Sequence, residues 1–155
     1  PQHWHYNDLL KHIHSKYDID YEFTVVRNPF QRLLSELHWR GIATSDLTQA
    51  MNTMGLRYLE YYVKNNYAMD NHIRPQQQFI GPTTNVFRFE EIQTVFDMLS
   101  NDFGVNQFAN HYQTNTYKPS TLDNLSDDFK KRYKEIYFKD HEMLKYSKPF
   151  EENNE

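Results

Sequence analysis

A chain of 155 residues is long enough to bury the core of one domain, and residues 1–155 are predicted to form a single one. Its 17 Lys and Arg against 21 Asp and Glu give a net charge of −4, which excludes a general electrostatic binder of nucleic acid and makes any anion site local. With no cysteine, disulfides and thiolate chemistry are excluded, and no apolar run approaches membrane-spanning length, so we expect a soluble cytoplasmic protein of bacterial or viral type.

The first predicted element is a short amphipathic helix over residues 4–16, which is rich in histidine. The histidines form two His-x-His pairs, His3 with His5 and His12 with His14. Such pairs are metal-ligand candidates on a strand, where they share a face, but residues two apart on a helix do not face each other. Solvated or hydrogen-bonded histidines are therefore the preferred interpretation, and no metal site is predicted.

A strand-to-helix turn follows at residues 23–40. The apolar run of residues 23–26 predicts a buried strand ending at Arg27, while Asn28 is a favourable N-cap and Pro29 suits the first helical position. The free N–H groups of the helix, the fork of Arg27 and the hydroxyl of Ser35 are together suited to phosphate. The alternative is an ordinary turn with a surface arginine.

Residues 46–65 are predicted to be helical in two pieces, with a break near Gly55, and residues 70–80 form a polar segment around Pro75. That segment is either a substrate-facing loop or a solvent-facing linker. A second strand is predicted over residues 85–89, and a helix over residues 90–103 that Gly104 stops. The repeat of strand followed by helix predicts an α/β fold with a parallel sheet.

The C-terminal third begins with a long polar loop over residues 105–125, a length that is usually functional or disordered. Ser126 is predicted to cap a helix that ends at Phe138. A last helical piece over residues 140–146 leads into an acidic tail, residues 147–155.

Five segments in order resemble the sulfotransferase family, most closely the carbohydrate O-sulfotransferase branch that includes the heparan sulfate 2-O-sulfotransferases. Arg27 and Ser35, eight residues apart in the turn, resemble that family's 3′-phosphate-binding motif. The other four segments are residues 3–5 (the family's His-x-His segment), 70–76, 86–92 and 137–146.

The resemblance implies a P-loop-NTPase-like sulfotransferase fold, in which helices flank a small parallel sheet. The reaction is transfer of a sulfuryl group from 3′-phosphoadenosine 5′-phosphosulfate to a hydroxyl, expected to belong to a carbohydrate. Arg27 and Ser35 would hold the 3′-phosphate of the donor. His5 would accept the hydroxyl proton as the catalytic base, with His3 as its helper.

The same resemblance implies roles for two more groups of residues. Tyr117 and Lys118 in the long loop, with the neighbouring Thr116, would contact the donor. The residues on the acceptor side would be His72, Arg74 and Gln76, and no metal is required.

The chain departs from the family by having no glycine-rich 5′-phosphosulfate loop, since none of its four glycines lies in a phosphate-loop context. We therefore expect that the first strand and phosphate loop are missing, and that a second copy or a partner chain covers the exposed sheet edge. Two alternatives remain open: a non-catalytic member that binds a nucleotide or an anionic glycan, and a structural interaction domain.

Overall fold

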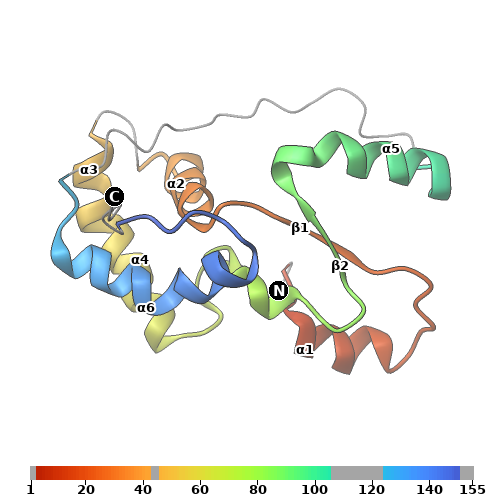
Figure 1. The fold of residues 1–155 in the computed structure, drawn as a ribbon. Coiled ribbons are helices and arrows are strands. Elements are labelled where there is room, and N and C mark those ends of the chain that lie inside the picture. Colours follow the sequence, from red (N-terminus) through yellow and green to blue (C-terminus); the bar gives the residue numbers. More distant parts are fainter. Residues whose placement is uncertain (1–2, 43–45, 106–123, 151–155) are drawn as a thin grey trace.

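The computed structural model describes residues 3–42, 46–105 and 124–150 and is mixed α/β (Figure 1). Its two strands, β1 (Phe23–Val26) and β2 (Asn85–Arg88), pair in parallel, with Phe23 opposite Asn85 and Val26 opposite Arg88. The prediction of an α/β chain with a small parallel sheet is confirmed at this level.

The N-terminal segment is helical, as predicted, but changes type. Helix α1 spans Tyr6–Leu9 and continues into a wider π-helical turn, Leu10–His14. Its N-cap is His5, whose Nδ1 accepts a hydrogen bond from the backbone N–H of Asp8 at 3.3 Å. One of the four histidines near this helix therefore has a capping role.

Helix α2 (Pro29–Trp39) begins where the sequence predicts it. The Oδ1 of Asn28 accepts hydrogen bonds from the backbone N–H groups of Phe30 (3.0 Å) and Gln31 (3.2 Å), and Pro29 occupies the first turn. The cap and the proline thus confirm the predicted turn from β1 into a helix.

The predicted break near Gly55 is wrong. Helix α3 (Leu47–Ala50) passes through a π-helical turn (Met51–Gly55) into α4 (Leu56–Lys64), and Gly55 itself has helical angles (φ −58°, ψ −50°). A Cβ on Gly55 would lie 3.3 Å from Cε2 of Phe129, so the glycine allows a close approach between two elements. Two short 3₁₀ turns follow, Ala68–Asn71 and Gln76–Phe79.

The elements after β2 agree with prediction except at one boundary. A 3₁₀ turn (Phe89–Glu91) precedes α5 (Ile92–Phe103), which Gly104 ends in the left-handed region at φ 67°. Ser126 caps α6, but this helix is continuous over Asp127–Met143, whereas the sequence predicted two pieces that meet between Phe138 and Asp140.

The main core lies between helices and not on the sheet. Buried apolar side chains of α2, the α3–α4 segment and α6 pack together, among them Leu33, Leu37, Leu59, Phe129 and Tyr133. In Figure 1 these helices group on one side of the two strands, while α1 and α5 lie on the other. The sheet therefore lies between two groups of helices. From the C-terminal end of β1 the chain passes directly into α2, which belongs to the main core.

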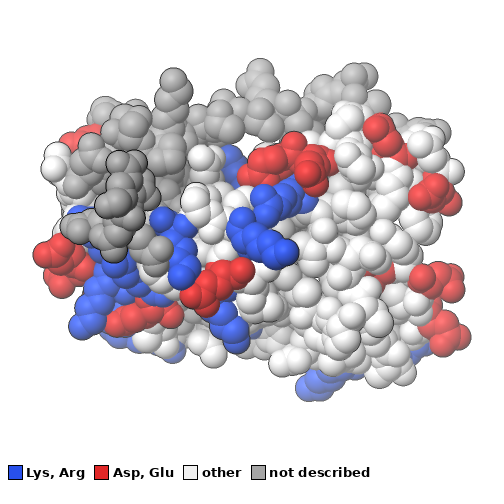
Figure 2. Space-filling view, in the orientation of Figure 1, with Lys and Arg blue, Asp and Glu red and all other residues white. Residues whose placement is uncertain are grey.

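Charges of both signs are spread over the face shown in Figure 2. Lys and Arg gather over the half that contains α6, whereas the half with α1 and α5 is mostly uncharged and its charged residues are mainly Asp and Glu. Among the described residues, no helix is both long and apolar enough to cross a membrane.

Candidate functional site

A pocket of about 480 Å³ lies along β1 and the adjoining helix α2. Five of the residues predicted for the site line it, namely His3, Arg27, Ser35, His72 and Gln76. They come from three separate parts of the chain: the N-terminus, the β1–α2 segment and the turns of residues 68–79. The fold thus brings together, in one pocket, predicted site residues that lie far apart in the sequence.

Arg27 is held at the end of β1 by Gln76. Its backbone N–H donates to Oε1 of Gln76 at 2.8 Å, and Nε2 of Gln76 donates back to the Arg27 carbonyl at 2.7 Å. The Arg27 guanidinium lies over the ring of Phe89, 4.9 Å from its centroid. Because both amide atoms of Gln76 are engaged, this side chain positions the backbone of Arg27, a role different from the acceptor contact predicted for it.

A buried carboxylate on α6 fixes that turn in place. Asp140 is fully buried, and its two oxygens accept from the backbone N–H groups of Gln76 (2.6 Å) and Gln77 (3.0 Å). Burial raises the pKa of Asp140 above its ordinary value, and the two backbone hydrogen bonds oppose that effect. A chain of contacts therefore runs from α6 through Gln76 to Arg27.

Arg32 also lines the pocket, and sequence reasoning missed it. Its guanidinium donates to the carbonyls of Arg74 (2.5 Å) and Asn71 (3.3 Å), and burial lowers its pKa. Arg32 therefore ties α2 to the turns that carry His72 and Gln76. In the sequence, the position of Arg32 in the predicted helix does not distinguish it from an arginine on the protein surface.

His72 faces the pocket with its ring oriented by Glu36, a second residue that the sequence did not single out. The Nδ1 of His72 lies 2.9 Å from Oε2 of Glu36, and Oε1 of Glu36 pairs with Nε of Arg40 at 2.5 Å. Glu36 is only 8% exposed, and each of its two oxygens contacts one of these partners. In the sequence, the spacing of four residues between Glu36 and Arg40 on a predicted helix could have indicated this ion pair.

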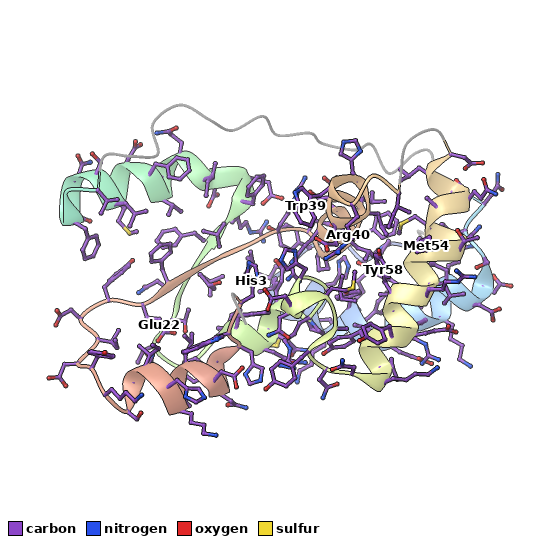
Figure 3. The ribbon with its side chains drawn as sticks, turned by 180° about the vertical axis from the view of Figure 1, so that it is seen from behind. His3, Glu22, Trp39, Arg40, Met54 and Tyr58 are labelled. Atoms are coloured by element: carbon purple, nitrogen blue, oxygen red, sulfur yellow. The ribbon has the colours of Figure 1, made fainter. Side chains whose placement is uncertain are left out.

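His3 lies against His72, with the two rings edge to face and their centroids 4.4 Å apart. The Nδ1 of His3 is 3.5 Å from Oδ2 of Asp70, and the His3 carbonyl accepts from Nδ2 of Asn71 at 2.5 Å. Figure 3 shows His3 near the middle of the molecule, with Trp39 above it on α2. His3 is thus held at the pocket through both its ring and its backbone carbonyl.

Two predicted residues do not line this pocket. Besides capping α1, His5 lies with its Nε2 3.4 Å from the hydroxyl of Tyr67. Arg74 is 4% exposed, and its guanidinium donates to the carbonyl of Asn66 at 2.9 and 3.2 Å. Both side chains therefore make structural contacts away from the pocket. Tyr117 and Lys118 lie outside the described residues, as do residues 106–123 in general.

Comparison with known proteins adds no relative to this picture. No family model matches the chain, and no curated protein or solved structure does.

Proposed function

We propose that the chain is a sulfotransferase that binds 3′-phosphoadenosine 5′-phosphosulfate and transfers its sulfuryl group to a carbohydrate hydroxyl. One observation supports this most: Arg27 and Ser35, the pair that resembles the family's 3′-phosphate motif, line one pocket beside β1 and α2. The first backbone N–H groups of α2, those of Phe30 and Gln31, already bond to Asn28, so the donors for an anion here are the side chains of Arg27 and Ser35.

In this proposal the guanidinium of Arg27 and the hydroxyl of Ser35 bind the 3′-phosphate, and Gln76 and Asp140 keep Arg27 in position. Arginine is suited to this role because its planar fork can donate two hydrogen bonds to one phosphate. Loss of those charge-assisted bonds would cost about 1.5–3 kcal/mol, or roughly 10- to 100-fold in affinity.

The base in this proposal is His72, since His5 does not line the pocket. The acceptor oxygen attacks sulfur, the bond from sulfur to the phosphate oxygen breaks, and the hydroxyl proton moves to Nε2 of His72. Adenosine 3′,5′-bisphosphate leaves. Glu36 favours the tautomer with the proton on Nδ1, leaving Nε2 as the acceptor, and stabilises the imidazolium that forms.

Calorimetric titration with adenosine 3′,5′-bisphosphate tests the donor site. We expect micromolar binding by the wild type and a loss of at least about 10-fold in Arg27→Ala. Arg57→Ala is the matched control, because Arg57 is exposed on α4 and away from the pocket. Absence of binding by the folded wild type would refute the proposal and leave the structural interaction domain.

Turnover is tested next with labelled donor and a panel of glycans. We expect transfer that falls by about 100-fold or more in His72→Ala, as is usual for removal of a general base, and that persists in His5→Ala. Nucleotide binding without transfer to any glycan would favour the non-catalytic alternative. A loss confined to His5→Ala would instead return the base role to that histidine.

A further inference from the structure

We propose that His3, Asp70 and His72 form a binding site for one divalent transition-metal ion, with Zn²⁺ as the best-suited ion. Each residue offers one ligand atom, and these atoms lie within 4.8 Å of one another. Two imidazoles and a carboxylate are a ligand set that binds Zn²⁺ with three protein donors and leaves a fourth position open. The proposal does not depend on sulfuryl transfer.

The distances are close to those of a bound ion. Ligand atoms about 2.0–2.1 Å from a tetrahedral Zn²⁺ lie about 3.3 Å from each other. The Nδ1 of His3 and Oδ2 of Asp70 are already 3.5 Å apart. The widest separation in the group, 4.8 Å, needs to close by about 1.5 Å, which side-chain rotation can supply because His3 and Asp70 are partly exposed.

Glu36 adds an outer partner of the kind that metal-binding histidines have. A ligating histidine usually donates its second ring N–H to a carboxylate, which fixes its tautomer and makes the other nitrogen a better ligand. The contact of 2.9 Å between Nδ1 of His72 and Oε2 of Glu36 meets this condition and leaves Nε2 to bind the ion. Arg40 pairs with the other oxygen of Glu36 and so fixes the carboxylate.

The backbone that carries Asp70 is strained in a way that serves the cluster. Met69, Asp70 and Asn71 have φ angles of 54°, 52° and 67°, and three successive left-handed residues without a glycine are uncommon. Strained backbone is concentrated at functional sites. Here it brings Asp70 to His3, while the side chain of Asn71 holds the His3 carbonyl at 2.5 Å.

A metal on His72 would also affect the proposed reaction. Nε2 of His72 has one lone pair, which either binds the ion or accepts a proton. A bound ion would therefore inhibit transfer. The guanidinium of Arg32 donates to the carbonyls of Arg74 and Asn71, so in this structure its N–H groups are engaged with the backbone of the turns.

The test is titration of Zn²⁺ into the chelator-treated protein, in competition with a coloured chelator and without any sulfuryl donor. We expect one Zn²⁺ per chain, and Co²⁺ should give visible absorption bands typical of nitrogen and oxygen ligands. Asp70→Asn removes the carboxylate while asparagine tolerates the left-handed backbone, and we expect at least 10-fold weaker binding. Glu36→Gln should weaken binding by about 10- to 100-fold.

His12→Gln is the control, because His12 is an exposed histidine outside the cluster, and its Zn²⁺ affinity should equal that of the wild type. Circular dichroism verifies the fold of every variant, and His3→Gln, which removes a partly exposed ligand, should also bind Zn²⁺ at least 10-fold more weakly. The proposal is overturned if the folded wild type binds no Zn²⁺, or if Asp70→Asn binds it as tightly as the wild type. Neither result bears on donor binding, which is measured separately with the nucleotide.

Discussion

The substitution Asp140→Asn tests whether the buried carboxylate of α6 holds the turn beside the pocket. In the wild type, its two oxygens accept from the backbone N–H groups of Gln76 and Gln77 at 2.6 and 3.0 Å. Asparagine has the same shape but only one acceptor oxygen, so its amide group faces a backbone N–H with no acceptor. One of the two N–H groups is then buried without a partner.

The expected cost follows from these contacts. A buried backbone N–H that loses its acceptor costs about 1–3 kcal/mol. The neutral amide relieves the burial of a charge, the factor that raises the pKa of Asp140, and this offsets part of the loss. We expect the free energy of unfolding to fall by about 2 kcal/mol.

The pH dependence gives a sharper test of the same reasoning. Because the folded pKa of Asp140 is raised, its contribution to stability is greatest below the pKa of the unfolded chain and is lost as the pH rises through the folded pKa. Asparagine does not titrate. The deficit of Asp140→Asn should therefore be larger at about pH 4 than at about pH 7.

Urea unfolding followed by circular dichroism measures both quantities. Asp102→Asn is the control, because Asp102 is exposed near the end of α5, and its effect should stay within about 0.5 kcal/mol. A deficit in Asp140→Asn that matched this control, or one that grew from pH 4 to pH 7, would show that burial does not govern this carboxylate.

Three further predictions concern stability and use the same unfolding assay. Asn28→Ala removes the N-cap of α2 and should cost about 1 kcal/mol; no loss would mean that water replaces the cap. Leu37→Ala, at a fully buried position, should cost about 3 kcal/mol, whereas Leu10→Ala, at a position 42% exposed, should cost under about 0.5 kcal/mol, and similar losses would contradict the assigned core. Burial raises the pKa of Tyr133 and Tyr137, so each should lower the free energy of unfolding by up to about 1.4 kcal/mol per pH unit above about pH 10. Exposed tyrosines such as Tyr17 should ionise in the folded protein, whereas the tyrosinate absorbance that is lost in Tyr133→Phe or Tyr137→Phe should appear only with unfolding.

The elements that the sequence predicted well are those defined by local chemistry. Asn28 with Pro29, Ser126 and Gly104 each satisfy or end the hydrogen bonding of their own helix, so neighbouring residues suffice to place the boundary. The two apolar runs before the helices likewise predicted both strands and their parallel pairing. Information of this kind lies within a few residues of the chain.

Where prediction was wrong, distant packing outweighed local preference. Gly55 was interpreted as a helix breaker, but its missing side chain makes room for Phe129, 74 positions further along the chain. The helix α6 continues through Lys139 into Asp140 because the buried carboxylate is satisfied by the turn at Gln76. A breaker and a buried charge are both unfavourable locally, and only the tertiary partners explain them.

The pocket shows the same difference between local and distant information. Sequence patterns identified several residues that line the pocket, but they did not identify Glu36, which orients the ring of His72. Glu36 and His72 are 36 positions apart, and their contact decides which nitrogen of His72 remains available. The proposed base and the proposed metal ligand are that one nitrogen, so the two proposals compete in a measurable way. If both hold, Zn²⁺ should inhibit transfer in the wild type but much less in Asp70→Asn, which keeps His72 and Glu36 while weakening the ion's site.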